Sequence, residues 1–82
     1  MKIIVLGAGK VGSNIAKNLS VQSYDVCVID KAVSRLKKLQ REYDLAIVSG
    51  HASHPDVLKK AGIDSDTILI SVTNDDEVNI VA

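Results

Sequence analysis

Four short apolar runs recur along this chain of 82 residues, about twenty residues apart. They are rich in Val and Ile, each is bounded by Gly, Asp, Asn or Ser, and they span residues 3–6, 26–29, 45–48 and 68–72. Runs of this length and composition are typical of buried β-strands. The pattern therefore predicts four strands.

The segments between these runs have the spacing of amphipathic helices. Val11, Ile15 and Leu19 recur every four residues, with the small residues Gly12 and Ala16 beside them. Three further helices are predicted in the same way: one with Leu36, Leu39 and Tyr43 inward, one with Val57, Leu58 and Ala61 inward, and one that begins near Asn74 and carries Val78 and Val81 on one side.

The predicted order is β-α-β-α-β-α-β-α, which is typical of a Rossmann-like, doubly wound α/β fold with a parallel sheet. Right-handed crossovers give the strand order 3-2-1-4, and ligands bind in such sheets where the direction of winding changes. Because complete domains of this kind have more than about a hundred residues, we expect residues 1–82 to be the N-terminal part of a dinucleotide-binding domain. The fourth strand would then form an exposed apolar edge.

Charge and composition exclude several classes of function. Ten basic and ten acidic residues cancel, and only two residues are aromatic, so we expect no nucleic-acid partner. No apolar run approaches the length of a membrane helix, so we expect no direct membrane insertion. The single Cys27 lies inside an apolar run, which predicts a buried, reduced thiol in the cytoplasm.

A glycine-rich segment follows the first predicted strand. Gly7, Ala8, Gly9, Lys10, Val11 and Gly12 form the pattern G-x-G-x-x-G, and Asp30 closes the next apolar run. In this setting the pattern is the dinucleotide-binding fingerprint. The first glycine allows a tight turn, the second lets a pyrophosphate approach bare backbone, and the third lets the helix pack on the strand. Lys10 is either a phosphate contact or an exposed lysine.

Asp30 is expected at the carboxyl end of the second strand. There it accepts hydrogen bonds from the hydroxyls of the adenosine ribose, and its charge favours NAD(H) over NADP(H). The structural alternative is that it only caps the following helix. Lys31 and Arg35 either border the adenosine pocket or belong to a solvated helix face.

Two further segments follow predicted strands. Gly50, His51 and Ala52 follow the third strand and are expected at the rim of the adenine pocket. His51 and His54, even with Asp56, make a poor zinc site, so no metal is predicted. Thr73 and Asn74 follow the fourth strand and are candidates to bind the second ribose or the pyrophosphate, although the acids after them also suit a helix N-terminus. No catalytic constellation is present in the sequence.

Taken together, these motifs resemble the TrkA family, cytosolic regulatory subunits of Trk-type potassium uptake systems, and in particular its N-terminal RCK-type domain. The resembling stretches are residues 1–12, 28–30, 49–58 and 70–79. The glycine loop is shared with many dehydrogenases, whereas G-H-x-S-H-P-D-V-L and V-T-N-x-D-E-x-N are more specific.

The resemblance implies a cytoplasmic regulatory domain, without catalysis, that senses NAD(H), or ATP or ADP. It also implies a homo-oligomer that controls a Trk-type membrane subunit at the inner face of the cell membrane. The alternative is the cofactor-binding half of an NAD-dependent dehydrogenase, which the glycine loop fits equally well. A methyltransferase that uses S-adenosylmethionine is a weaker match, because its loop usually lacks the third glycine.

Overall fold

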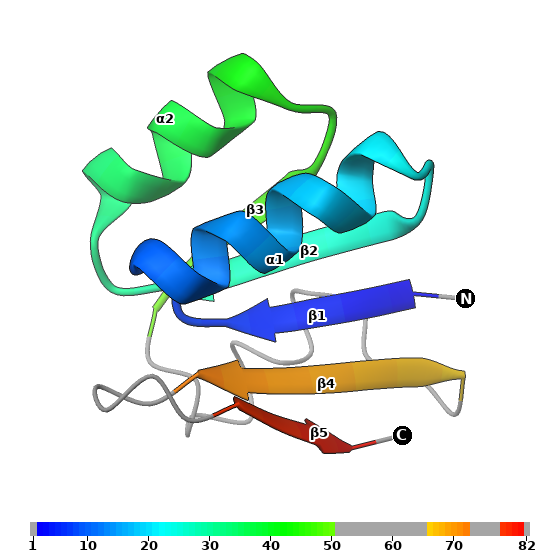
Figure 1. The fold of residues 1–82 in the computed structure, drawn as a ribbon. Coiled ribbons are helices and arrows are strands. Elements are labelled where there is room, and N and C mark those ends of the chain that lie inside the picture. The colour runs from blue at the N-terminus through cyan, green and yellow to red at the C-terminus, as the bar shows by residue number, and fades with distance from the viewer. Residues whose placement is uncertain (1, 51–65, 73–77, 82) are drawn as a thin grey trace.

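A computed structural model of the chain describes residues 2–50, 66–72 and 78–81, the last of these for the backbone alone. Five strands and two helices lie within these residues (Figure 1). In chain order they are β1 (Lys2–Leu6), α1 (Lys10–Val21), β2 (Asp25–Asp30), α2 (Val33–Glu42), β3 (Ala46–Ser49), β4 (Thr67–Val72) and β5 (Val78–Val81).

The five strands form one sheet in the order β3-β2-β1-β4-β5. The first four are parallel, which confirms the predicted Rossmann-like fold and the order 3-2-1-4. In the register of the sheet, Leu6 lies opposite Ile29 on one side and Ser71 on the other, and Asp30 lies opposite Ser49. The carboxyl ends of four strands therefore meet at one edge of the sheet.

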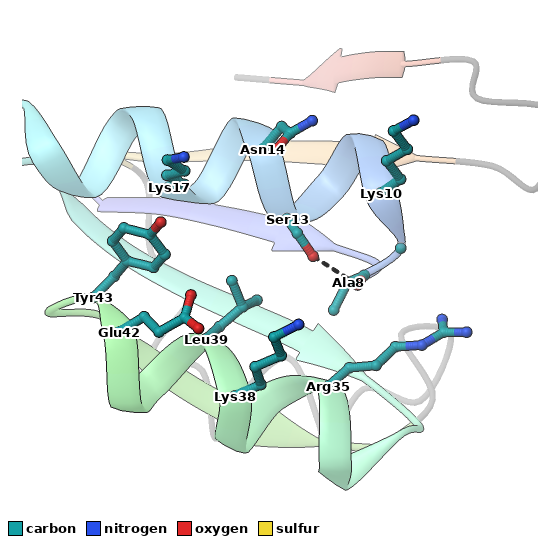
Figure 2. Close-up of a pocket in the computed structure, with 11 residues that line it drawn as sticks. Ala8, Lys10, Ser13, Asn14, Lys17, Arg35, Lys38, Leu39, Glu42 and Tyr43 are labelled. Carbon is teal, nitrogen blue, oxygen red and sulfur yellow. Dashed lines mark hydrogen bonds between the residues drawn. The ribbon is translucent and has the colours of Figure 1, made fainter.

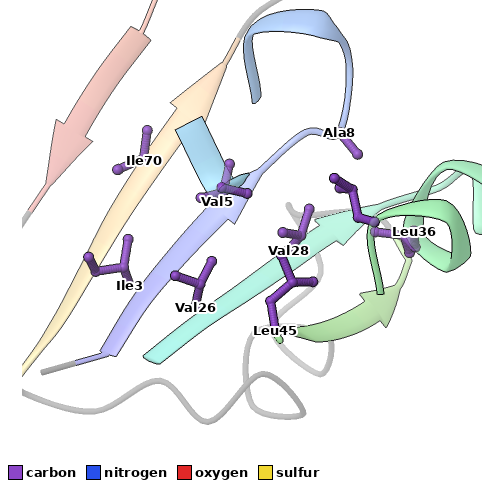
Figure 3. Packing of buried hydrophobic residues seen from close by; sticks show 10 residues of the cluster. Ile3, Val5, Ala8, Val26, Val28, Leu36, Leu45 and Ile70 are labelled. Carbon is purple, nitrogen blue, oxygen red and sulfur yellow. The ribbon is translucent and has the colours of Figure 1, made fainter. Parts of the chain in front are cut away.

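Both helices cover the same face of the sheet, as Figure 1 shows. Alternate strand residues face them because side chains of a strand point to opposite faces in turn. The larger core cluster of buried residues consists of Ile3, Val5, Ala8, Ala16, Val26, Val28, Leu36, Leu39, Leu45 and Ile70 (Figure 3). Gly12 and Ala16 are the buried residues of α1, so the predicted small-residue stripe is the part of this helix that lies closest to the sheet.

The opposite face of the sheet is also buried. Ile4, Cys27 and Ile29 form a second cluster, with Leu6, Val48 and Leu69 packed against it. Burial on both faces explains why the strands read as nearly continuous apolar runs. Cys27 is a free, buried thiol, as predicted, and burial raises the pKa of this thiol above its ordinary value.

The prediction of a fourth helix is wrong for the carboxyl end of that segment. Val78 and Val81, assigned to one face of that helix, belong instead to β5, which pairs antiparallel with β4. The segment Val78–Val81 has three β-branched residues out of four, and such residues favour strands. Without β5, this edge of β4 would present unpaired backbone N–H and C=O groups, which favour the addition of a neighbouring strand.

Pairing with β5 overturns a second expectation, that the fourth strand would be an exposed edge. The third strand is shifted by one residue from the predicted 45–48, since β3 spans Ala46–Ser49. Leu45, which precedes it, is buried. The predicted third helix and the start of the predicted fourth lie outside the described residues.

Candidate nucleotide site

A cavity of about 210 Å³ lies at the edge where the carboxyl ends of the strands meet. Its lining comes from the ends of β1, β2 and β4 and from residues that directly follow β1, β2 and β3: Leu6, Gly7, Ile29, Asp30, Lys31, Gly50, Ser71 and Val72. β1 and β4 are neighbours in the sheet although the chain forms β2 and β3 between them. The cavity is therefore at the point where the winding of the sheet changes direction, the position at which such folds bind ligands.

The glycine loop turns sharply from β1 into α1. Gly7 has a φ of 111°, which L-residues with a side chain rarely adopt, and its N–H donates to the carbonyl of Ile29 at 2.8 Å. A Cβ built at Gly12 would overlap with the carbonyl oxygen of Gly7 and lie 3.7 Å from Cγ2 of Val72. The first turn of α1 thus packs directly on the loop and on the end of β4.

Gly9 has a different environment from the other two glycines of the motif. It is the N-cap of α1, it is exposed, and a Cβ built on it would meet no atom of the described residues within 4 Å, its chain neighbours aside. The first N–H groups of a helix have no partner within the helix. The first turn of α1 contains no acidic residue, so the helix supplies no carboxylate of its own there. The residues present therefore fit a pyrophosphate at this place.

Asp30 contacts the glycine loop and the start of α2 at the same time. Its Oδ2 accepts a hydrogen bond from the N–H of Ala8 at 2.6 Å, and its Oδ1 accepts one from the N–H of Ala32 at 2.7 Å. Its own carbonyl oxygen accepts the N–H of Gly50 at 3.0 Å. The contact to Ala32 holds the N-cap residue of α2, but no side chain of the described residues caps the helix itself. Asp30 also lines the cavity at the sheet edge.

Ala8 is held from its carbonyl side as well. The hydroxyl of Ser13 donates to the carbonyl oxygen of Ala8 at 2.8 Å, an interaction drawn in Figure 2. Ala8 is almost fully buried, although it lies in a loop between two glycines. Two side chains, one from β2 and one from α1, therefore fix the conformation of this loop.

A second, larger cleft of about 440 Å³ lies between α1 and α2 (Figure 2). It carries four cationic side chains and one carboxylate, and Lys38 and Glu42 extend into it from α2. The cations are Lys10, Lys17, Arg35 and Lys38. Lys17 also lies over the ring of Tyr43, with its Nζ 5.9 Å from the ring centroid.

The basic residues that the sequence suggests for the adenosine pocket line two different clefts. Lys31 lines the cavity at the sheet edge with Asp30, whereas Arg35 lines the cleft between the helices with Lys10. Val11 is half-buried in the first turn of α1. His51, Ala52, Thr73 and Asn74 lie outside the described residues.

Three residues at this edge are not among the sequence-based candidates. Ser13 fixes Ala8, and Ser71 and Val72 line the cavity from β4. Ser71 had a signal in the sequence, because it interrupts the apolar run of its strand near the carboxyl end. Val72 had none, since its packing beside Gly12 depends on the tertiary fold.

The described part of the chain lacks two further features. None of the helices there is long and apolar enough to cross a bilayer. No three His, Cys, Asp or Glu side chains come together there as metal ligands would.

Comparison with known proteins gives the family. The TrkA-N domain matches residues 3–82, which is nearly the entire chain. The chain belongs to the TrkA-N domain family. The resemblance found in the motifs is thereby confirmed, and the Rossmann-like fold of this TrkA-N domain agrees with it.

Several curated relatives are Trk system potassium uptake proteins, and each match covers the whole of this TrkA-N domain. The TrkA protein of Vibrio alginolyticus is 51% identical over 82 residues, and that of Halomonas elongata is 45% identical. A TrkA homologue of Archaeoglobus fulgidus is 37% identical. The chain spans only 18% of the length of each of these relatives.

Proposed function

We propose that this TrkA-N domain is the nucleotide-binding part of a cytoplasmic regulatory subunit, without catalytic activity, that binds NAD(H), or ATP or ADP, and thereby controls a Trk-type potassium uptake system. The family and the names of the relatives support the link to potassium uptake. The observation that carries the proposal is the open backbone at Gly9, at the N-terminus of α1 and beside the glycine turn.

The pyrophosphate would bind at Gly9. The N-terminal end of a helix carries a partial positive charge of about half a unit, and its free N–H groups donate to phosphate oxygens. Lys10, exposed in the first turn of α1, adds a full positive charge near this position.

Asp30 would bind the adenosine ribose. An ionised carboxylate has about four lone-pair sites, and backbone N–H groups occupy two of them. The other two remain to accept the 2′- and 3′-hydroxyls. A 2′-phosphate would instead meet a like charge, so the site favours NAD(H) over NADP(H).

The remaining candidates would complete the site around this centre. Gly50, at the end of β3, would border the adenine together with His51 and Ala52. Thr73 and Asn74, directly after β4, would bind the second ribose or the pyrophosphate.

Regulation would follow from differential affinity. A ligand that binds one arrangement of paired domains better than another shifts the population toward that arrangement. We propose that the full-length subunit forms a homo-oligomer and that its Trk-type membrane partner responds to this shift at the inner face of the membrane. The pairing of β4 with β5 removes the exposed strand edge as a reason for self-association, so this part rests on the family resemblance.

The test is potassium uptake in cells whose only copy of the full-length subunit carries Gly9→Val. We expect uptake to lose its response to nucleotide while the protein accumulates to normal levels. Normal, regulated uptake by a variant that no longer binds nucleotide would show that nucleotide sensing is not the mechanism. Oxidation of a hydroxy-acid substrate by the wild-type protein with NAD⁺ would instead favour the dehydrogenase alternative.

A further inference from the structure

Asp30 is positioned to do more than recognise a ribose. Its two carboxylate oxygens accept from two backbone segments that are far apart in the sequence, the glycine loop at Ala8 and the start of α2 at Ala32. The donor nitrogens lie 2.6 Å and 2.7 Å from the carboxylate oxygens, just below and at the short limit of the usual range for such bonds. Hydrogen bonds to an ionised acceptor are stronger than neutral ones. The carboxylate therefore joins the loop and the helix as one unit.

The backbone around Asp30 extends this connection. The N–H of Gly7 donates to the carbonyl oxygen of Ile29, and the N–H of Gly50 donates to that of Asp30. The segments that follow β1 and β3 are thus both attached to the last two residues of β2. Among the hydrogen bonds that Ile29 and Asp30 accept, the one from Ala8 lies nearest in the sequence to Gly9, where the pyrophosphate is proposed to bind.

The side chain of Ala8 is a buried methyl group, and the glycines on either side have no side chain. None of these three residues therefore has a side chain that could form a hydrogen bond to the peptide groups of the loop. Asp30 binds the N–H of Ala8, and Ser13 binds its carbonyl oxygen. These two contacts fix the peptide groups on both sides of Ala8, and with them the orientation of the backbone that leads to the N–H groups of Gly9 and α1.

We propose that Asp30 is a positioning residue for the glycine loop, in addition to its role toward ribose under the proposed function on which this inference rests. The carboxylate holds Ala8 so that the backbone at Gly9 points its donors at the phosphates. A ligand that lacks both ribose hydroxyls still depends on Asp30, because the phosphates bind to a loop that Asp30 holds.

Two nucleotides separate the two roles in the full-length protein. ADP has both ribose hydroxyls and 2′,3′-dideoxy-ADP has neither, while their phosphates are identical. Asp30→Asn offers one side-chain oxygen where the wild type offers two, so it leaves the N–H of Ala8 or that of Ala32 without its acceptor. We expect the affinity for dideoxy-ADP, measured by calorimetry, to fall about tenfold, and the affinity for ADP to fall further.

Three variants serve as comparisons. Ser13→Ala removes the other contact to Ala8 without any ribose contact, so it should weaken both nucleotides by the same factor. Asp25→Asn makes the same chemical change at the other end of β2, where Asp25 is exposed, and should change neither affinity. Asp30→Glu keeps a carboxylate but moves it by one methylene, and it should also weaken dideoxy-ADP. It replaces Asp30→Asn if that variant does not fold.

Hydrogen exchange gives a readout without any ligand. The exchange of the Ala8 amide, resolved by mass spectrometry with electron-transfer fragmentation, should speed up about tenfold or more in Asp30→Ala, which removes both acceptor oxygens, while amides in the middle of β1 keep their wild-type rates. A wild-type protein that binds neither these two nucleotides nor NADH contradicts the proposed function, and the exchange at Ala8 then decides the positioning role alone. Unchanged dideoxy-ADP affinity together with unchanged exchange at Ala8 would overturn the inference and leave Asp30 as a ribose contact.

Discussion

Gly9 and Gly12 lie three residues apart in the same glycine motif, yet their surroundings in the structure are opposite. At Gly12 the space for a side chain is already filled, because a Cβ would overlap with the carbonyl oxygen of Gly7. At Gly9 no atom of residues 2–50 or 66–72, apart from its chain neighbours, lies within 4 Å of such a Cβ, and the backbone conformation, with φ at −69°, is open to any residue.

The comparison separates two requirements that the motif combines. Gly12 serves the fold, since it lets α1 pack on the glycine turn and on β4. Contacts among the described residues do not require a glycine at position 9. They therefore do not explain why a glycine is found there. Close approach of a ligand to the backbone is the explanation that the position supports, because Gly9 is the N-cap of α1.

Among the variants, Gly12→Ala is expected to lower the free energy of unfolding the most. The added methyl group must displace either the start of α1 or the turn at Gly7, and overpacking of this kind costs about 3 kcal/mol in the free energy of unfolding. Gly9→Ala is the matched control, and it should cost less than about 1 kcal/mol, the difference between Gly and Ala at an N-cap. Denaturation with urea, followed by circular dichroism, measures both.

Equal costs for these two variants would break the comparison. The result would mean that the loop can adjust around Gly12, or that Gly9 has a structural role that its open surroundings do not reveal.

A smaller effect is expected for Gly7→Ala, and it sharpens the comparison. The space at Gly7 is tight but not filled, with the carbonyl oxygen of Val72 3.3 Å from the added Cβ. The cost therefore comes mainly from the φ of 111°, and strain of this kind costs about 2 kcal/mol. The same denaturation experiment should place this variant between Gly12→Ala and Gly9→Ala. A cost as small as that of Gly9→Ala would show that the turn can adopt another conformation.

The parallel part of the sheet and most of this loop could be predicted from the sequence. Val and Ile runs at regular spacing predicted the four parallel strands, and the glycine spacing predicted where α1 begins, because both patterns follow directly from local geometry. The position of Asp30 at the end of β2 followed in the same way. Its bond to Ala8 did not, since that contact joins residues 22 positions apart and depends on how β1 and β2 align.

The prediction was wrong for the segment Val78–Val81 because two patterns compete there. Val78 and Val81 are three residues apart, which suits one face of a helix, while Val78 and Ile80 alternate as in a strand. The pairing of this segment with β4 decides between them, and a partner strand cannot be read from four residues. Ser13 and Val72 could not be assigned to the site for a similar reason, since each acts through a neighbour that only the fold supplies.

The most direct test of the account is calorimetric titration of NADH into the full-length protein with and without Gly9→Val. The valine side chain projects into the space at the N-terminus of α1, where its Cβ meets no atom of the described residues within 4 Å, its chain neighbours aside. We expect the variant to remain folded by circular dichroism, with a melting temperature within a few degrees of the wild type, and to bind NADH at least about tenfold more weakly. A folded variant that binds NADH with wild-type affinity would contradict the assignment of this loop as the nucleotide site.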